Sequence, residues 1–473
     1  MSLPWRFNTV EDYVQGTIAR LQQASPTYRH LNVGKYFLCR TDELSHHHLQ
    51  RILEAAQNNP HIDELTLSGI PTKHGCSSAF VALSQLSQLL RSRPWKRVIF
   101  MACEGEVIAA ALDNGLVDIQ EIRLSRYETL SAGVMVALQQ TLTRSTLRHL
   151  VLSEVVLSHV ACNDILSLVE GIAASSSLEI LEINYCILND KSINSLSAHG
   201  LCKNTSLVAL HMPGCEMDDE AVRMVVEGIS HHPKLKTLKL FRNHCGERGV
   251  QALAKVLLQS KPKDPTLPFA TIQLETLDLS YQQFERQQKL DVDVLANSLA
   301  HNTTLKNLIL AFNKLNDTDA ICLAEGLHRH PDLAEIDLRA NNIRDAGAVA
   351  LAEKVLSCSP KLRKFCLYGN PLGEIGGHSV LAAIQANTEV ETINMDYGMP
   401  AYDKIHYYTY LNQVGRRLMK EEDFNPALWP IIIERARRTS LETRGVCTAA
   451  DLIYPFVRES TILNRWMDLR QER

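Results

Sequence analysis

The sequence predicts an α/β repeat array in which every unit adds one short strand and one helix to a single solenoid. One observation is a nine-residue motif, apolar at its first, fourth and sixth positions, that recurs along the chain. A second is a pair of apolar positions, four residues apart, that follows most copies and marks one face of a helix. The composition, with 45% hydrophobic and 22% charged residues, excludes a disordered or collagen-like chain.

The clearest copy of the motif is Leu333–Asn341, with apolar residues at Leu333, Ile336 and Leu338 and an asparagine at its ninth position. Close relatives begin at Leu235, Leu305 and Leu362. Weaker copies begin at Ile62, Trp95, Ile119, Leu147, Leu178, Leu207, Leu274 and Val390, and a degenerate copy begins near Leu31. From Leu147 to Leu235 and from Leu274 to Val390, successive copies start 28 to 31 residues apart.

Each motif predicts a strand, because the alternation of Leu238 and Leu240 sends both side chains to one face. The short helix of one unit cannot cover that face, so units must stack and their strands must pair in parallel. Parallel strands lie about 4.8 Å apart, whereas packed helices need about 10 Å. We therefore expect a curved array with the strands on the concave face and the helices on the convex face.

The ninth position of the motif predicts a turn and a bond to the neighbouring unit. Asparagine occupies it at Asn243, Asn313, Asn341 and Asn370, where its amide can bind backbone groups. Cys103, Cys186 and Cys215 fall at the same position, so we expect them to be buried thiols of the fold.

This pattern resembles the leucine-rich repeat family in its 28-to-29-residue, ribonuclease-inhibitor-like form, which also occurs in NOD-like receptors and Ran GTPase-activating proteins. The resemblance covers residues 30–398, or about 13 units. It implies a horseshoe-shaped solenoid and says little about function.

The two ends and two irregular spacings depart from the repeat. Residues 1–29, with a helix from Thr9 to about Gln23, are expected to be an N-terminal helical cap. Residues 399–473 are expected to be a C-terminal helical cap or a docking tail, with helices near 427–436 and after Thr448. The 24 residues between Trp95 and Ile119 predict a shortened helix, and the 39 between Leu235 and Leu274 include a Pro-rich loop at 261–268.

Several functional classes find no support in the sequence. The 49 Lys and Arg against 53 Asp and Glu do not indicate nucleic-acid or membrane binding. Phosphate-loop, G-x-S-x-G and H-E-x-x-H motifs are missing, and Gly373–Gly377 falls where each repeat turns from strand to helix. Consecutive His46, His47 and His48 on a helix point in three directions and cannot share one ion. We expect no catalytic, cofactor or metal site.

The start of the chain lacks the apolar core of a signal peptide, and no run of 18 apolar residues occurs. The 12 cysteines are scattered, with no C-x-x-C pair. We therefore expect a cytoplasmic protein with reduced thiols, and a monomer.

The candidate binding site is the inner strand surface, where odd positions between the buried leucines point outward. Its later units carry aromatic and arginine side chains, the types that dominate interface hot spots. The earlier units carry a blander mixture, such as Glu64, Thr66 and Ser68. The predicted partner-binding residues are Lys239, Phe241, Arg242, Tyr281, Phe312, Asp337, Arg339, Tyr368 and Tyr397.

These features favour a non-enzymatic scaffold that binds a partner protein through its concave face. The alternative that the resemblance allows is a GTPase-activating protein for a Ran-like small GTPase. Such proteins usually carry a strongly acidic tail, whereas the tail from Leu411 has 11 basic and 9 acidic residues. A NOD-like sensor would need a nucleotide-binding module, and a ubiquitin-ligase substrate receptor would need an adaptor-binding box. The sequence contains no recognisable nucleotide-binding module. Residues 1–29 do not resemble an adaptor-binding box, but the C-terminal tail could contain one, so the receptor stays open as a variant of the scaffold hypothesis.

Overall fold

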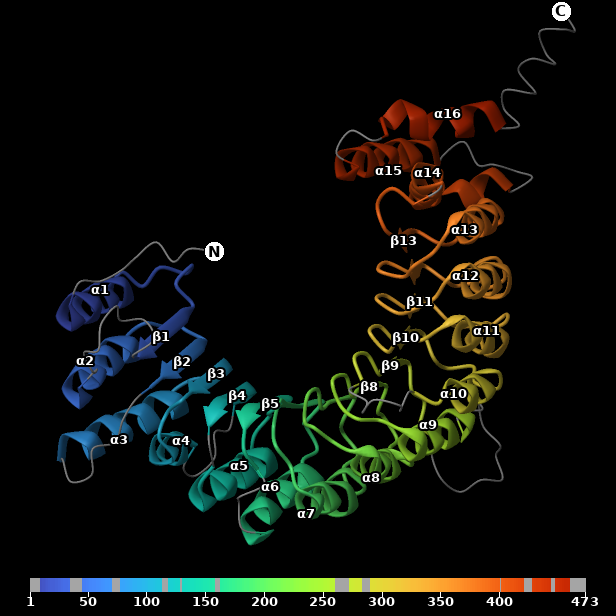
Figure 1. Cartoon of the computed structure of the whole chain (residues 1–473). Helices are drawn as coiled ribbons and strands as arrows, with labels where there is room; N and C mark the ends of the chain where they lie inside the picture. The colour runs from blue at the N-terminus through green and yellow to red at the C-terminus, as the bar shows by residue number, and fades with distance from the viewer. Residues whose placement is uncertain are drawn as a thin grey trace, which may run out of the picture. The chain divides into compact units, whose positions relative to one another are not determined.

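The computed structural model describes residues 9–34, 45–69, 77–112, 118–127, 130–157, 162–259, 272–282, 290–399, 401–420, 428–443 and 447–459. The contacts divide the chain into two compact units. The first comprises Met1–Ala252 and Pro265–Gln273, and the second comprises Leu253–Asp264 and Leu274–Arg473. Both are built from alternating parallel strands and helices (Figure 1).

The first unit begins with a helix and then alternates eight described strands with helices. Its strands are β1 (His30–Gly34), β2 (Glu64–Ser68), β3 (Trp95–Met101), β4 (Ile119–Tyr127), β5 (His149–Val155), β6 (Ile180–Asn184), β7 (Ala209–His211) and β8 (Thr237–Lys239). Its helices are α1 (Val10–Gln22), α2 (His46–Gln57), α3 (Ser77–Arg91), α4 (Gly105–Leu112), α5 (Ala132–Arg144), α6 (Cys162–Ala174), α7 (Asp190–Ser195), continued by the π-helical η2 (Leu196–Leu201), and α8 (Asp219–Ile229). Helix α9 (Glu247–Gln259) has residues in both units.

The second unit contains five described strands and ends in helices. Its strands are β9 (Thr276–Asp278), β10 (Asn307–Ile309), β11 (Glu335–Asp337), β12 (Lys364–Cys366) and β13 (Thr392–Asn394). Its helices are α10 (Val292–Leu299), α11 (Asp317–Gly326), α12 (Asp345–Leu351), continued by the π-helical η3 (Ala352–Leu356), α13 (Glu374–Ala386), α14 (Tyr402–Val414), the 3₁₀ helix η4 (Arg416–Lys420), α15 (Trp429–Glu442) and α16 (Ala449–Glu459).

Equivalent motif positions pair across neighbouring strands. In the second unit Leu308 lies opposite both Leu277 and Ile336, and in the first unit Leu210 lies opposite Leu181 and Leu238. All strand pairings among the described residues of each unit are parallel, and helices α10 to α13 stack along one side of β9 to β13 (Figure 1). The predicted solenoid of strands and helices is confirmed in each unit.

The core lies between strands and helices, as the two periodicities predict. The fourth and sixth motif positions are fully buried, for example Leu238 and Leu240. The predicted helix positions are buried too, at Leu196, Val225, Leu253, Leu323, Leu351 and Val380, and four residues later at Ile229, Leu257, Leu327, Val355 and Ile384. Burying such a side chain contributes about 1.5–3 kcal/mol, so this layer dominates the stability of the array.

The ninth position forms the expected link between neighbouring repeats. The Asn341 amide donates to the carbonyls of Leu310 and Leu338 (3.0 and 2.9 Å), and its Oδ1 accepts from the N–H groups of Asn313 and Leu315. At the cysteine copies, the thiol reaches the carbonyl of the preceding repeat, as Cys215 does to Ile183 (2.9 Å). Burial raises the pKa of the Cys186 and Cys215 thiols to about 12. Both asparagine and cysteine predictions are confirmed.

A second set of buried asparagines lies three residues before the start of several motifs, where the side-chain amides bind backbone groups at the ends of the helices. Asn204 donates to the carbonyl of Ile172 (2.6 Å) and accepts from the N–H groups of Ser206 and Leu207. Asn302 and Asn387 make equivalent contacts. Asn204 and Asn302 are also in glycosylation sequons, and at 1% and 2% exposure they are inaccessible to a glycan.

His232 and His330 occupy this same position where the asparagine is replaced. The His232 ring Nδ1 accepts from the N–H groups of Lys234 and Leu235, which requires a ring nitrogen without a proton. Burial lowers the pKa of His232 to about 4 and also lowers the pKa of His330. Both histidines are therefore structural helix-end groups.

The glycine-rich turns have a structural partner in the preceding repeat. The Asp345 carboxylate at the start of α12 accepts from the N–H groups of Gly373 and Gly376 (2.7 and 2.8 Å) at the start of α13. Asp219 and Asp317 do the same for α9 and α12. A Cβ at Gly376 would lie 2.7 Å from the Asp345 carboxylate. The glycines thus belong to the repeat geometry, as predicted.

Other sequence expectations have mixed outcomes. Helix α4 is short, as the 24-residue spacing predicts, and Thr448 accepts from Asp451 N–H at the start of α16. Helix α15 extends six residues beyond the predicted Ala436, and α14 was not predicted at all. The Pro-rich segment 261–268 lies outside the described residues.

Candidate protein-binding surface

Each repeat leaves four positions uncovered by helices: the third, fifth and seventh motif positions and the eighth, in the turn that follows. We call the surface that they form in each unit the open strand face. It is the face that the sequence predicts to bind a partner. Its two parts, in the two units, have different chemistry.

In the first unit, the open strand face is occupied by a network of ion pairs. Glu121 on β4 binds Arg97 on β3 (2.9 Å) and Arg123 on its own strand. Glu182 on β6 lies 3.0 Å from His149 Nε2 and 3.5 Å from His211 Nδ1. The hydrogen bonds from these two histidines and from Asn184 hold the pKa of Glu182 well below its usual range. The charges on this surface are therefore largely satisfied within the molecule.

The eighth position has a left-handed backbone conformation in both units. Glycine, which adopts it at little cost, occupies it at Gly69, Gly214 and Gly369. The other copies with positive φ are Ala102, Arg126, Glu154, Tyr185, Arg242, Tyr281, Phe312 and Ala340. A non-glycine residue there costs about 1 kcal/mol or more. Five of these copies, Arg126, Tyr185, Arg242, Tyr281 and Phe312, nevertheless carry a large aromatic or arginine side chain with a positive φ.

Three of the predicted binding residues are in the first unit. Lys239 and Phe241 are half-buried, and Arg242 is exposed with φ of 56°. The Arg242 guanidinium lies over the ring of Tyr185, 5.6 Å from its centroid. Gly214 makes this possible, because a Cβ there would come within 2.4 Å of the Tyr185 ring. Tyr185, 44% exposed, thus belongs to the same surface, although sequence reasoning missed it.

The other six predicted residues are in the second unit, where four aromatic side chains are exposed on the open strand face. Tyr281 and Phe312 follow neighbouring strands, with ring centroids 5.6 Å apart. Tyr368 follows β12, and Tyr397, 90% exposed, packs edge-on against Tyr402 of α14. Interfaces are enriched in such aromatic side chains, which bury much area at low cost in conformational entropy.

The structure differs from the prediction at Asp337, which is only 2% exposed. Its carboxylate accepts from Nε and Nη2 of Arg339 (2.8 and 2.6 Å), and this hydrogen bonding raises the pKa of Arg339. The fifth position is covered here because the Arg339 side chain folds back across it. Asp337 therefore orients Arg339 and has little surface left to meet a partner.

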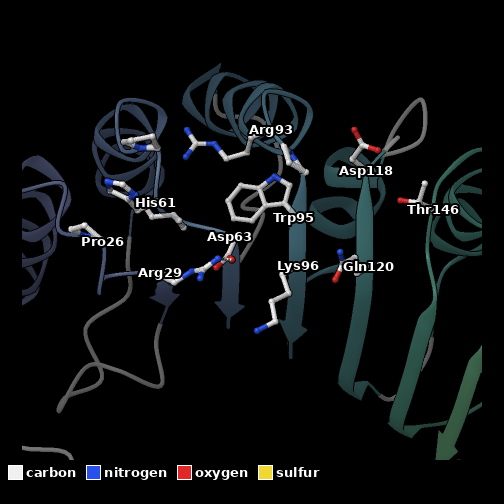
Figure 2. A pocket seen from close by; sticks show the side chains of 13 residues that line it. Pro26, Arg29, His61, Asp63, Arg93, Trp95, Lys96, Asp118, Gln120 and Thr146 are labelled. Carbon is white, nitrogen blue, oxygen red and sulfur yellow. Dashed lines mark hydrogen bonds and ion pairs between the residues drawn. The ribbon is translucent and has the colours of Figure 1, made fainter.

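A hollow of about 730 Å³ lies at the opposite end of the strands in the first unit, near the starts of β2, β3 and β4 (Figure 2). Arg29 pairs with Asp63, and Arg93 donates to carbonyl oxygens at the end of α2. The buried Trp95 donates its Nε1–H to the Leu90 carbonyl. These polar side chains are used to close the ends of helices and strands, so they do not define a catalytic arrangement.

The sites that the sequence raised and rejected can also be located. His48 forms a capping box with Ser45 at the start of α2 and lies 3.7 Å from Glu11. Among the described residues, no group of three or more His, Cys, Asp or Glu side chains is arranged to hold a metal ion. None of the described helices has both the length and the apolarity needed to cross a bilayer.

Comparison with known proteins identifies the repeat. A family model described as "Leucine Rich repeat" matches residues 301–324 and 330–352. The mouse protein "NACHT, LRR and PYD domains-containing protein 9C" is 29% identical over 175 residues, covering 37% of this chain and 16% of that protein. The mouse "Centrosomal protein of 78 kDa" is 33% identical over 86 residues, covering 18% of this chain and 11% of its own. The chain thus spans less than a fifth of these relatives.

Solved structures of similar architecture cover most of the chain at low identity. The yeast Rad7 and Elc1 complex contains a chain with 14% identity and a TM-score of 0.43, covering 82% of this chain and 89% of that one. An internalin (inlF) of Listeria monocytogenes has 15% identity and a TM-score of 0.40, with coverages of 82% and 94%.

Proposed function

Since this chain is a leucine-rich-repeat protein, related to the repeat regions of mouse NACHT, LRR and PYD domains-containing proteins, we propose that it is a non-enzymatic scaffold that binds a partner protein through its open strand face. The observation that carries the proposal is the exposure of Tyr281, Phe312, Tyr368 and Tyr397 on one face of the second unit. Lys239, Phe241 and Arg242, with Tyr185, form the corresponding surface of the first unit.

The surface is well suited to binding because it is preorganised. The amides of Asn313, Asn341 and Asn370 fix the backbone of the turns around them, and Arg339 is held by Asp337 through two nitrogen atoms. A rigid surface loses little conformational entropy when a partner binds, so more of the contact energy appears as affinity.

The ends of the array support the assignment of both terminal segments as caps. On α14, Asn412 donates to the carbonyls of Asn387 and Val390, and just beyond it Arg416 donates to Ile384 (2.8 Å). Tyr13 of α1 donates to the Asn32 carbonyl on β1 (2.6 Å). These side chains satisfy backbone groups that a further repeat would otherwise bind. We propose that residues 1–29 are the N-terminal cap, that 30–398 are the repeats, and that 399–473 are a C-terminal cap or a docking tail, with these contacts favouring the cap.

The proposal includes a monomeric, cytoplasmic protein. The buried thiols of Cys186 and Cys215 support a reducing environment, because each occupies an internal position of the repeat and donates to a backbone carbonyl of the preceding repeat.

Affinity capture from a native lysate tests the proposal with two matched variants of the second unit. One carries Phe312→Ala and Tyr368→Ala on the open strand face. The control carries Ile321→Ala and Ile375→Ala, which remove exposed apolar side chains from helices α11 and α13. We expect the partner protein to be retained by the wild type and the control and lost from the open-face variant. Each hot-spot side chain that is removed should weaken the binding free energy by about 2 kcal/mol. Equal retention by all three would place the interface elsewhere.

A further inference from the structure

The open strand face of the second unit has an excess of negative charge. Its acidic residues are Asp278, Glu335, Asp337 and Asp396, and its basic residues are Arg339 and Lys364. Arg339 is paired with Asp337, and Lys364 with Glu335 at 2.6 Å. These pairs neutralise each other, which leaves Asp278 and Asp396 as the source of the net charge.

Neither of these two carboxylates forms an ion pair with a described residue. Asp278 accepts hydrogen bonds from the N–H and hydroxyl groups of Ser280 (2.9 and 2.6 Å), and Asp396 accepts from the Gly369 N–H (2.8 Å). Both are half-buried. Each therefore has a fixed position and a negative charge that no cation of the described chain neutralises.

Each carboxylate belongs to a repeat that carries one of the exposed aromatic side chains, and a neighbouring repeat carries a second. Asp278 ends β9, and Tyr281 of the same repeat packs against Phe312 of the next. Asp396 is followed directly by Tyr397, and the Gly369 amide that it binds is preceded by Tyr368. The face thus carries two similar groups, one at β9 and β10 and one at β12 and β13, each with one carboxylate and two π faces.

A carboxylate next to aromatic rings favours a cationic side chain. The π face attracts an ammonium or guanidinium group, and the stem of a lysine or arginine packs against the ring while its head meets the carboxylate. The same negative charge disfavours acidic segments and phosphate backbones. Resting on the proposed protein-binding function, we infer that this face binds an extended basic segment of a partner protein, with one Lys or Arg in each group.

The distance between the two groups sets the spacing of the basic residues. From β9 to β13 there are four strand steps of about 4.8 Å, or roughly 19 Å. An extended segment advances about 3.3 Å per residue, so the two cations are about six residues apart. Residues separated by six in an extended chain point to the same side, as this geometry requires.

Synthetic peptides test both the charge and the spacing. The probe is a fluorescent Gly/Ser peptide of roughly 15 residues with two arginines six residues apart, and binding to the full chain is measured by fluorescence anisotropy. Comparison peptides carry two glutamines, two glutamates, or two arginines only two residues apart. We expect the widely spaced arginine peptide to bind at least about tenfold more tightly than each of these, with an affinity that falls as salt is added.

Isosteric variants test the assignment to Asp278 and Asp396. The variant with Asp278→Asn and Asp396→Asn is expected to bind the arginine peptide about tenfold more weakly. The control with Asp293→Asn and Glu353→Gln removes the same charge from exposed positions on α10 and η3, and it is expected to bind like wild type. Circular dichroism checks that both variants are folded.

Three results would overturn the inference: equal binding of the glutamine peptide, no binding of any peptide, or equal losses in the two variants. Failure of the inference is separable from failure of the proposed function. If lysate proteins are lost from the Phe312→Ala, Tyr368→Ala variant but retained by the Asp278→Asn, Asp396→Asn variant, the face binds protein but does not recognise a basic segment. If both variants retain them, the proposed function itself fails.

Discussion

Replacing Asn341 by alanine should destabilise the second unit far more than the same change at its neighbour Asn342. The Asn341 side chain is 8% exposed and binds four backbone groups at 2.9 to 3.1 Å, two N–H groups and two carbonyls, in two successive repeats. Asn342 is exposed, and its backbone N–H bond to the Leu315 carbonyl survives the substitution. The pair therefore separates the ladder contact from the general effect of losing an amide.

The magnitude follows from the four partners that lose their bonds. A buried polar group left unsatisfied costs about 1–3 kcal/mol, and water entering from the turn recovers part of this cost. We expect Asn341→Ala to lower the free energy of unfolding by about 3–4 kcal/mol, and Asn342→Ala to lower it by less than about 0.5 kcal/mol. For a unit of roughly 200 residues, 3 kcal/mol corresponds to a fall in melting temperature of about 6–12 °C.

Differential scanning calorimetry and urea unfolding, followed by circular dichroism, measure the difference. A repeat array can unfold in parts, so the transition that moves should be the one assigned to the second unit. Asn341→Cys provides an internal comparison, since cysteine fills this position at three repeats and its thiol can reach one carbonyl. It should fall between wild type and Asn341→Ala. If Asn341→Ala and Asn342→Ala melt within about 1 °C of each other, the ladder does not stabilise the array as argued.

Three further predictions concern single positions. Burial lowers the pKa of His232 to about 4, so below pH 6.5 the unfolded chain binds a proton that the folded chain does not. The protein should therefore lose stability as the pH falls from 6.5 to 4. The difference in melting temperature between wild type and His232→Asn should change across that range and stay constant above it. Gly326→Ala should lower the melting temperature, because the new Cβ would lie 2.2 Å from the Ala296 carbonyl oxygen. Gly133→Ala should leave it unchanged, because no neighbouring atom is closer than 3.9 Å to the new Cβ. Equal effects of the two substitutions would contradict this packing argument. Phe312 has φ of 61°, so the Phe312→Gly variant should be more stable to urea than Phe312→Ala by about 1 kcal/mol. Both substitutions remove the ring, and only glycine adopts the left-handed backbone without strain. The reverse order of stability would exclude strain at this position.

The repeat itself could be predicted from the sequence because its physics is local and periodic. The alternation of Leu238 and Leu240 predicts one face of a strand, and the spacing of Val225 and Ile229 predicts one face of a helix. Both spacings recur in every clear copy of the repeat. Asn341 could be assigned to the turn because it follows the strand at the ninth motif position, where an asparagine amide typically binds the backbone of a turn.

The features that the sequence did not predict depend on individual side-chain contacts or lie outside the repeat pattern. Tyr185 belongs to the open strand face because Gly214, in the next repeat, leaves room for its ring. Asp337 is covered by the Arg339 side chain, a rotamer that periodicity does not specify. The role of Asn204 at a helix end was not predicted, because its amide donates to the carbonyl of Ile172 in the repeat before it. Helix α14 has no repeat pattern to reveal it, because the two faces of its sequence differ little in polarity.

The eighth position provides an independent reason to regard the aromatic residues as functional. The repeat accepts glycine there at Gly69, Gly214 and Gly369, so the fold does not require a side chain. Tyr281 and Phe312 have a left-handed backbone, which costs free energy in a residue other than glycine. Their side chains are 44% and 50% exposed, so burial compensates only part of this conformational cost. Their mutual ring contact contributes about 0.5–1.5 kcal/mol, comparable with the strain of one residue. Strain of this kind persists where function selects it, and a partner that covers both rings would recover the remaining energy.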